Sequence, residues 1–303
     1  MKNVNIPVQS AFKTKILKWR KKSVGEKVFL VVFFLYFVFQ AVIQIIPFLW
    51  VINNSLKTLP EFSQNSFSIT SSWQFVNYIK VFDQFIVNGV VGYGEMLFNS
   101  LWQTFVYLFV NLFSSMLIAY ALAKFNFPGK NVLYGLMIFV QTIPVIGTGA
   151  AGYKFRYQLG MVDNPWLMWI SWAVGFDYSA FLMYGTFHGV SNSYAESAEI
   201  DGANEWHILF KVVFPQIFPL ILALMVTNFI GRWGDYSTAQ IYLPSYPNLA
   251  YGMYLFQLGS SWAQDGKVVY FASIILSALP GVVLYALFQK TIITNVSLGG
   301  LKG

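Results

Sequence analysis

Long stretches without a charged side chain are the feature that most limits what this chain can fold into. A helix that crosses a bilayer needs roughly 20 predominantly apolar residues. Only 10% of the residues are charged, against about 25% in an ordinary soluble domain, while 56% are hydrophobic and 19% aromatic. This composition excludes both a soluble globular protein and a disordered chain. The windows free of Asp, Glu, Lys and Arg are 28–56, 96–123, 131–153, 178–195, 212–231, 236–264 and 268–289.

Six of these windows are predicted to be membrane-spanning helices. The window 236–264 differs, because Pro244 and Pro247 stand close together and would leave backbone groups unpaired in lipid. We predict a loop or a partly inserted segment there. The fourth window extends back to Pro165 if Asp177 is allowed inside the membrane. The prediction is an all-α, polytopic membrane protein with helices near 28–51, 97–123, 132–151, 165–187, 216–233 and 269–289.

The distribution of Lys and Arg predicts how the chain is oriented. Residues 1–27 hold eight of the 19 Lys and Arg residues. If that end is cytoplasmic, thirteen of the 19 lie on the cytoplasmic side of the predicted helices and five on the outer side, while Arg232 lies at a helix end. Basic loops stay on the cytoplasmic side, so we predict a multi-pass cell-membrane protein with both termini cytoplasmic. The basic N-terminus is then a topology signal, and no nucleic-acid partner is expected. The predicted parts are a cytoplasmic segment 1–27, a six-helix membrane domain 28–289 and a cytoplasmic tail 290–303.

Residue types that build catalytic and metal sites are scarce. The chain has no Cys and only two His, which excludes disulfides, thiolate catalysis and polyhistidine or zinc-finger sites. The stretch 147–152 matches Gly-x-Gly-x-x-Gly by letter, but a dinucleotide site needs a strand before it, and here it ends a predicted membrane helix. The stretch also lacks the Gly-Lys-Ser/Thr that cradles phosphates. We therefore predict no catalytic residue, no metal and no ATP site on this chain.

The segment 193–215 does not fit a simple helical bundle. It connects the fourth and fifth predicted helices on the cytoplasmic side and contains four of the 12 acidic residues. Connections between helices usually have about 2–8 residues, and long ordered ones tend to be functional. Ser193 and Glu196 fit a capping box at a helix start. Gly202 fits a helix end, and Asn204 can cap a second helix.

The second helix of this segment is predicted to be amphipathic. Its apolar residues follow i, i+3, i+4, i+7 spacing and would form one face. Pro215 is predicted to mark where this helix ends and the next begins. The segment is thus expected to present two short helices, at an angle, to a cytoplasmic partner. The predicted apolar face consists of Trp206, Leu209, Phe210 and Val213.

The segment 193–215 resembles the EAA motif of binding-protein-dependent ABC-transporter permeases, which reads Glu-Ala-Ala, three residues, Gly, nine residues, Ile-x-Leu-Pro. The spacing here is complete, and the departures are modest changes in size. The residues that match are Glu196-Ser197-Ala198, Gly202 and Val212-x-Phe214-Pro215. The neighbours Asp201-Gly202-Ala203 and Glu205-Trp206 are similar to the carbohydrate branch of that family.

The resemblance extends over residues 28–303. The ending Gly299-Gly300-Leu301-Lys302-Gly303 is similar to the tail of the maltose-type second permease subunit. Four further stretches are similar to the same subunit: Ser55-Leu56-Lys57, Gln141-Thr142-Ile143-Pro144, Leu159-Gly160-x-Val162-Asp163 and Ser277-Ala278-Leu279-Pro280.

The resemblance implies a fold, a function and a set of partners. The fold is the type I ABC importer permease fold, and the function is import of a sugar or oligosaccharide by alternating access. The partners are a second, different permease subunit, two ATP-binding subunits and an extracytoplasmic sugar-binding protein. ATP and Mg²⁺ are expected on the ATP-binding subunits, so this chain binds no cofactor and is not itself an enzyme.

The resemblance also assigns residues to contacts with the ATPase. The two short helices around the glycine form a coupling helix that sits in a cleft of the ATPase subunit. By position, the coupling residues are Glu196, Ser197, Ala198, Glu199, Asp201, Gly202, Trp206 and Pro215. The tail residues expected to reach the ATPases are Gly300, Lys302 and Gly303.

Polar side chains in or beside the predicted spans are candidates for the translocation pathway: Gln141, Asp177, Asn228 and Asp235. A carboxylate inside a membrane helix is costly and usually faces a cavity or a partner. Asp177 is therefore expected to pair with a neighbouring subunit, to lie nearer the surface, or to contact substrate as part of the pathway. Trp233-Gly234-Asp235-Tyr236 resembles the family's Trp-Asn-Glu/Asp-Phe. Asp235 then faces the pathway or the binding protein, or is a solvated loop residue.

Two other functions stay open. An ATP-independent secondary transporter or channel would fit the helices but gives no reason for the segment 193–215. An ABC permease for another polar solute, such as glycerol phosphate, would favour basic residues in the spans, and the charge-free windows contain almost none.

Overall fold

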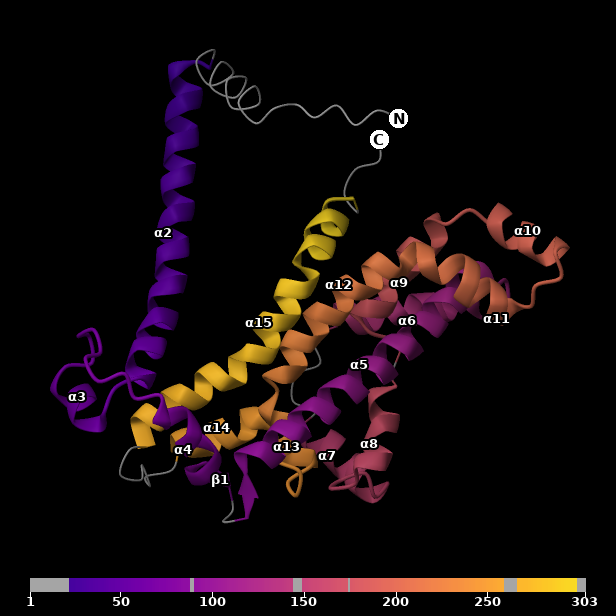
Figure 1. Ribbon diagram of the computed structural model, residues 1–303. Helices are drawn as coiled ribbons and strands as arrows, with labels where there is room; N and C mark the ends of the chain where they lie inside the picture. The colour runs from indigo at the N-terminus through magenta and orange to yellow at the C-terminus, as the bar shows by residue number, and fades with distance from the viewer. Residues whose placement is uncertain (1–21, 88–89, 144–148, 174, 259–265, 299–303) are drawn as a thin grey trace.

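The computed structural model describes residues 22–87, 90–143, 149–173, 175–258 and 266–298, with side chains as far as Gln289 (Figure 1). The described chain is almost entirely helical, with one two-stranded antiparallel hairpin in which Ile86 pairs with Gly92. The elements are α2 (Val24–Ser55), α3 (Leu59–Gln64), α4 (Val76–Gln84), β1 (Ile86–Val87), β2 (Val91–Gly92), α5 (Tyr93–Lys124), α6 (Lys130–Thr142), α7 (Gly149–Gln158), α8 (Pro165–Trp172), α9 (Tyr178–Gly189), α10 (Ser193–Ile200), α11 (Glu205–His207), the π-helix η1 (Ile208–Val213), α12 (Phe214–Trp233), α13 (Tyr236–Tyr242), α14 (Leu249–Leu258) and α15 (Gly266–Leu298).

Four helices of the described chain are long and apolar enough to cross a membrane. They are α2, α5, the continuous helix Glu205–Trp233 and the part of α15 up to Gln289. These four confirm the first, second, fifth and sixth predicted spans. The first of them begins with the capping box of Ser23 and Glu26, in which each side chain bonds the backbone N–H of the other residue.

The third and fourth predicted spans are each divided into two shorter helices, so the prediction of single helices there was wrong. The span 132–151 falls on α6 and α7; α6 ends at Thr142, just before Ile143 and Pro144. A residue that precedes proline disfavours the helical region. The span 165–187 falls on α8 and α9. Between them Gly175 has φ of +66° and lies so close to Ile118 of α5 that a Cβ would clash.

The described part of the window 236–264 contains no spanning helix but two short ones, where a loop or a partly inserted segment was predicted. α13 ends at Tyr242 and α14 begins at Leu249, with both prolines in the turn between them. Buried polar side chains of α5 hold this turn: Asn99 donates to the Pro247 carbonyl at 3.0 Å, and Gln103 donates to the Tyr246 carbonyl at 2.8 Å. The backbone groups that prolines leave open are thereby satisfied within the protein.

α5 is the central helix of the body and packs against α8, α9, α12 and α14. One apolar core lies where α5, α9, η1 and α12 meet, with Met116, Met183, Phe187 and Ile217 buried in it. A second core lies where α4, α5, α14 and α15 meet, with Phe85, Tyr93 and Leu249 buried in it. Phe187 stacks edge-on to Tyr120 of α5, with ring centroids 5.4 Å apart. These cores fix the helices that carry the segment 193–215.

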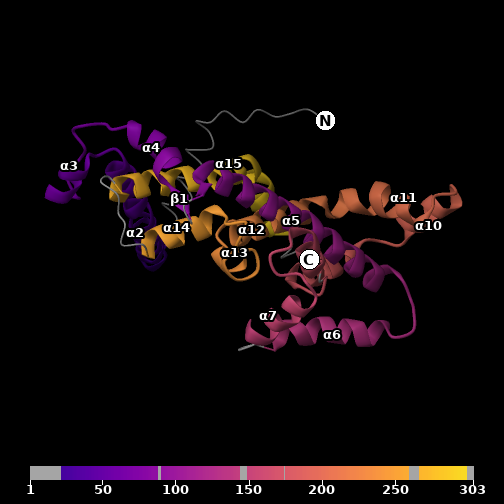
Figure 2. The same ribbon diagram turned by 90° about the horizontal axis from the view of Figure 1, so that it is seen from below.

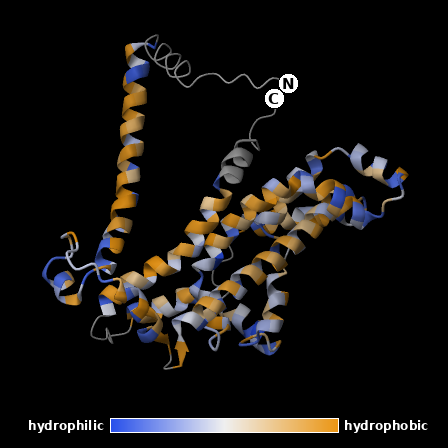
Figure 3. Ribbon diagram, viewed as in Figure 1, coloured by the Kyte–Doolittle hydropathy of each residue, from blue (hydrophilic) through white to orange (hydrophobic). Residues whose placement is uncertain are grey.

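Helix α2 stands apart from the body and is apolar along most of its length (Figures 1 and 3). None of its most apolar 18-residue window is buried. It contacts the body at the end near Ser55, where Trp50 meets Phe271 of α15 with ring centroids 5.2 Å apart. A helix that is hydrophobic all round requires lipid or a partner chain around it.

The segment 193–215 projects from the body at the end opposite α3 and α4, in both views (Figures 1 and 2). In Figure 1 the first described residues of α2, the last described residues of α15 and the segment 193–215 all lie in the upper part of the picture. The start of α2, the end of α15 and the segment 193–215 therefore lie toward one side of the described chain.

A polar cap covers the other side. Lys57 is fully buried and donates to the Asn65 carbonyl at 2.9 Å, and burial lowers the pKa of its ammonium group. Glu61 accepts hydrogen bonds from the hydroxyl of Ser72 and the N–H of Ser71, which lower the pKa of its carboxyl group. These contacts give the loop after α2 a fixed shape.

Candidate functional site

The first half of the segment is helix α10, which ends at a left-handed glycine. Gly202 has φ of +81°, and its N–H bonds the Glu199 carbonyl at 2.9 Å. The next N–H, of Ala203, bonds the Ala198 carbonyl at 2.9 Å. Glycine adopts this conformation without steric cost. The predicted helix end at Gly202 is therefore confirmed.

The start of α10 differs from the prediction. Ser193 is the first residue of the helix rather than its cap, and Asn192 before it makes no side-chain cap bond. The Ser193 N–H and hydroxyl instead bond the Ser191 hydroxyl, at 3.3 and 2.8 Å. The predicted capping box of Ser193 and Glu196 is therefore wrong, and the Glu196 side chain stays exposed.

The second half begins as predicted, with the Asn204 side chain accepting the His207 N–H at 2.8 Å. The helix that follows runs without interruption from Glu205 to Trp233. Its stretch Ile208–Val213 is a π-helix. Pro215 lies just after this wide turn, near the start of α12. Pro215 therefore marks the boundary between the π-helix and α12, as predicted, but the chain continues through it as one helix. A wide turn before a proline relieves the clash that its ring makes with the carbonyl four residues earlier.

The π-helix also changes which residues share a face. Ile208, Leu209 and Val213 are 1–2% exposed and pack into the core of α5, α9 and α12. Trp206 is 59% exposed and Phe210 38% exposed, and their rings stack with centroids 6.0 Å apart. The predicted single apolar face is therefore split in two, because the spacing of a π-helix is i, i+5 rather than i, i+4.

The outer surface of the segment carries the residues that the resemblance assigned to the ATPase. Glu196, Ser197, Glu199, Asp201, Gly202, Trp206 and Pro215 are all exposed. Ala198 is half-buried and packs against the core below. A Cβ added at Gly202 would meet no atom within 4 Å. The segment thus has a buried side that fixes it to the membrane helices and an open side of acidic and aromatic residues.

A polar cleft of about 340 Å³ lies between this segment and the end of α5. Glu196, Glu199 and Glu205 line it together with Lys124 of α5. The Lys124 ammonium donates to the Val190 carbonyl at 2.5 Å and to the Asn192 side chain at 2.9 Å. Lys124 therefore ties the end of α5 to the connection between α9 and α10.

Of the pathway candidates, Asp177, Asn228 and Asp235 are half-buried and Gln141 is exposed. Asp177 is not within a helix as predicted. It caps α9: one of its carboxylate oxygens accepts the Ala180 N–H at 3.0 Å and the Ser115 hydroxyl at 2.8 Å. A cap position lets the carboxylate bond free helix N–H groups, which lowers the cost of a charge in the membrane.

The other three candidates also bond neighbours within the chain. The Asn228 amide donates to the Ser179 hydroxyl at 3.1 Å, and the Gln141 amide donates to the Phe176 carbonyl at 3.2 Å. Asp235 caps α13 and forms an ion pair with Arg232 at 2.7 Å. Asp177 and Asn228 thus meet partners on the same small region of α9, whereas Asp235 lies at the far end of α12.

A buried polar column on α5 was not predicted. Gln103, Tyr107, Asn111 and Ser115 follow each other at intervals of four residues, and all but Tyr107 are less than 5% exposed. Residues four apart share one face of a helix, so this spacing within an apolar span could have identified the column. Asn111 Oδ1 is buried and has no hydrogen-bond partner among the described residues.

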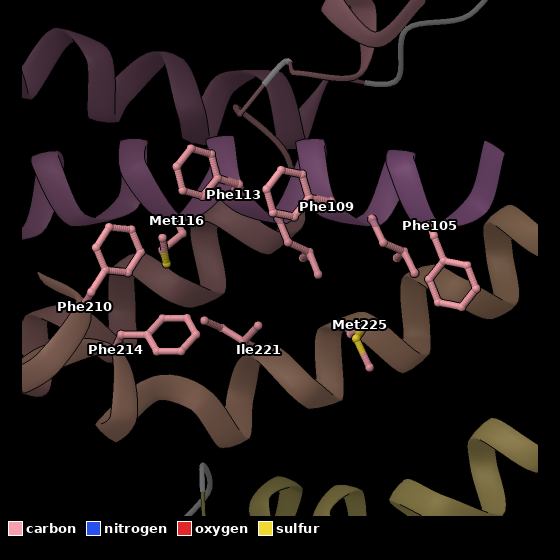
Figure 4. Close-up of a pocket in the computed structure, with 10 residues that line it drawn as sticks. Phe105, Phe109, Phe113, Met116, Phe210, Phe214, Ile221 and Met225 are labelled. Carbon is pink, nitrogen blue, oxygen red and sulfur yellow. The ribbon is translucent and has the colours of Figure 1, made fainter. Parts of the chain in front are cut away.

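The opposite side of α5 borders an apolar groove of about 390 Å³ that it forms with η1 and α12 (Figure 4). Phe105, Phe109 and Phe113 line it from α5, facing residues such as Phe214 and Met225. None of its lining side chains is polar. Such a groove cannot recognise hydroxyl groups and suits a lipid chain or an apolar helix face.

The tail residues Gly300, Lys302 and Gly303 lie outside the described residues. In the part of the chain that the structure describes, no group of three or more His, Asp or Glu side chains could hold a metal ion.

Comparisons with known proteins agree with this architecture. Residues 111–297 match the family described as the binding-protein-dependent transport system inner membrane component. The diacetylchitobiose uptake system permease protein NgcG of Streptomyces coelicolor is 27% identical, over 86% of this chain and 85% of its own length. The galactooligosaccharides transport system permease protein GanQ of Bacillus subtilis is 26% identical, over 89% of this chain and 94% of its own length.

A solved structure has the same fold. A chain of a bacterial ABC transporter involved in the import of the acidic polysaccharide alginate superposes with a TM-score of 0.76. The match covers 89% of this chain and 98% of that chain, at 22% sequence identity.

Proposed function

The chain belongs to the family of binding-protein-dependent transport system inner membrane components, and from this we propose that it is a permease subunit of an ATP-driven importer for a sugar or oligosaccharide. One observation carries the proposal. The exposed segment 193–215 is joined, through a continuous helix of 29 residues, to the interior of the membrane domain. The names of the relatives, which are permease proteins of a diacetylchitobiose uptake system and of a galactooligosaccharides transport system, support a saccharide as the solute.

We propose that the segment is the coupling element, which receives motion from an ATPase subunit. Its open side would sit in a cleft of that subunit, with Glu196, Ser197, Ala198, Glu199, Asp201, Gly202, Trp206 and Pro215 as the contact set. The buried side, at Ile208, Leu209 and Val213, would transmit the displacement to α5 and α9. Because packed cores transmit strain rather than absorb it, displacement of the segment would tilt these helices together.

The proposed partners follow from surfaces that this chain leaves uncovered. The apolar side of α2 and the groove between α5 and α12 require lipid or the apolar helices of a second permease subunit. Two ATP-binding subunits would bind the side of segment 193–215, with ATP and Mg²⁺ on them. A sugar-binding protein would deliver solute at the side of the cap.

The proposed orientation has both termini in the cytoplasm. The segment 1–27 would carry the basic residues that set the orientation, 28–289 would be the permease domain, and the tail 290–303 would reach the ATPases through Gly300, Lys302 and Gly303. The charge distribution supports this orientation.

For the solute path we propose the polar interior rather than the apolar groove. Asp177 and Asn228, with Gln141 toward the same end of α9, offer groups that can exchange a bond within the chain for one to a sugar hydroxyl. Asp235 lies at the outer end. Glycerol phosphate is disfavoured as the solute because the charge-free windows leave few cations to bind an anion. A secondary transporter would not need the coupling element.

The proposal is tested by the composition of the complex that forms around the tagged, full-length chain. After mild solubilisation from the native membrane, an ATPase subunit and a second permease should be recovered with it, in a ratio of two ATPases to one copy of each permease. Mass spectrometry of the purified particle measures this ratio. Recovery of the chain alone, or only as a homo-oligomer without ATPase, would overturn the proposal.

A further inference from the structure

Arg232 is a charged side chain held almost entirely inside the membrane body. Its side chain is 9% exposed, and it lies near the outer end of the helix Glu205–Trp233. Ionisable groups in membrane-spanning segments are costly and usually functional. None of the roles discussed above uses this residue.

The contacts of Arg232 join four elements. Its Nη1 donates to Asp235 Oδ2 at 2.7 Å and to the Thr238 hydroxyl at 2.9 Å, both at the start of α13. Its guanidinium carbon lies 4.9 Å from the ring centroid of Tyr107 on α5 and 4.7 Å from that of Trp172 on α8. The two rings themselves meet edge to face at 6.0 Å.

This geometry suits a planar guanidinium in particular. It can stack on aromatic faces and still donate hydrogen bonds at its edge, which a lysine ammonium cannot do in the same way. Asp235 is fixed independently, because its other oxygen accepts the Thr238 N–H and its carbonyl accepts the Asn248 amide. The buried Nη2 has no hydrogen-bond partner among the described residues. The rings of Tyr107 and Trp172 and the carboxylate of Asp235 therefore hold the Arg232 guanidinium in place.

The contacts of Arg232 lie at the opposite end of the helix Glu205–Trp233 from the segment 193–215. Glu205, at the other end of the same helix, belongs to the segment 193–215. Between the two ends lie the π-helix and Pro219, both of which make a helix easier to bend. If the outer end were free, displacement of the segment could be lost as sliding or bending of this one helix.

We propose that Arg232 is a positioning residue that anchors the outer end of the helix Glu205–Trp233 to α5 and α8, so that displacement of the coupling segment moves these helices as one body. This inference rests on the proposed role of the segment 193–215. The anchor is the set Arg232, Tyr107, Trp172 and Asp235.

The test measures anchoring and coupling separately in the complete complex. The chain has no Cys, so spin labels can be placed at I230C on α12 and W166C on α8, which are 61% and 72% exposed. In the otherwise wild-type complex, the label-to-label distance should have one narrow distribution both without nucleotide and with ADP and vanadate. In Arg232→Ala the distribution should broaden, and solute moved per ATP hydrolysed should fall by about tenfold or more, as expected when a buried pair loses one partner. Arg232→Lys should recover only part of both quantities.

Arg156→Ala is the matched control. Arg156 also lies over an aromatic ring, that of Tyr242 at 4.9 Å, but it belongs to α7 and not to the coupling helix. It should leave the distance distribution and the coupling ratio unchanged. Wild-type values of both quantities in Arg232→Ala would overturn the inference. ATPase subunits should stay bound in every Arg232 variant. Loss of the ATPase subunits is the result expected when the coupling segment itself is altered. The same loss in an Arg232 variant would therefore indicate a docking defect and would contradict a role confined to anchoring.

Discussion

Replacing Gly202 by Trp is expected to remove the ATPase subunits from the purified complex while the chain itself still inserts and folds. The residue has φ of +81° and ends α10, and a Cβ there would meet no atom of this chain. A side chain would therefore project into the space that a docked subunit must occupy. The backbone cost of a Cβ in this conformation is about 1–2 kcal/mol, too small by itself to unfold a membrane domain.

Gly202→Asn distinguishes the effect of side-chain bulk on ATPase binding from the effect of backbone conformation, because Asn tolerates the left-handed region better than other residues with a Cβ. We expect it to retain most of the bound ATPase. The measurement is the ratio of ATPase to tagged chain after purification, compared among wild type and the two variants. A wild-type ratio in Gly202→Trp would contradict docking at this turn, and equal loss in both variants would contradict the role given to bulk.

The second large effect is a difference in folding between two variants. Each variant carries one Asp in the helix after Asn204, either on its buried face or on its exposed face. Leu209 is 2% exposed in the core of α5, α9 and α12, so Leu209→Asp buries a carboxylate without a partner. That costs several kcal/mol and should reduce the yield of folded chain by about tenfold or more. Trp206→Asp, at a position 59% exposed, should leave the yield near wild type and weaken ATPase binding.

Fluorescence-detected size exclusion of the two variants checks this pair. The π-helix predicts opposite outcomes, since it places the two side chains on different faces. A regular α-helix with the apolar face expected from the spacing would bury both side chains together, and both variants would then fail to fold. Equal tolerance of the two variants would contradict the packing of the segment on its core.

The elements that could be predicted from the sequence are those set by local chemistry. Uninterrupted apolar runs define α2, α5, α12 and α15, since hydrocarbon accepts little else. The turn at Gly202 and the cap at Asn204 follow from residues a few positions apart. The spacing of the segment 193–215, together with the ending at 299–303, carries the resemblance to the family that the match over residues 111–297 confirms.

The features that could not be predicted depend on contacts between distant segments or on a change of helical period. The π-helix at Ile208–Val213 moves Trp206 out of the face where 3.6-residue spacing places it. The break at Gly175 depends on the close approach of Ile118 in another helix. The Arg232 cluster brings Tyr107 and Trp172 together from positions that have no pattern in common.

Solute uptake by reconstituted liposomes tests the central claim most directly. The complex purified through this chain, with its binding protein and a panel of labelled oligosaccharides outside, should accumulate one class of saccharide only when ATP and Mg²⁺ are supplied on the ATPase side. Uptake should stop with ADP and should be insensitive to collapse of proton and sodium gradients. Gradient-driven uptake without ATP, by the chain free of ATPase subunits, would contradict the account.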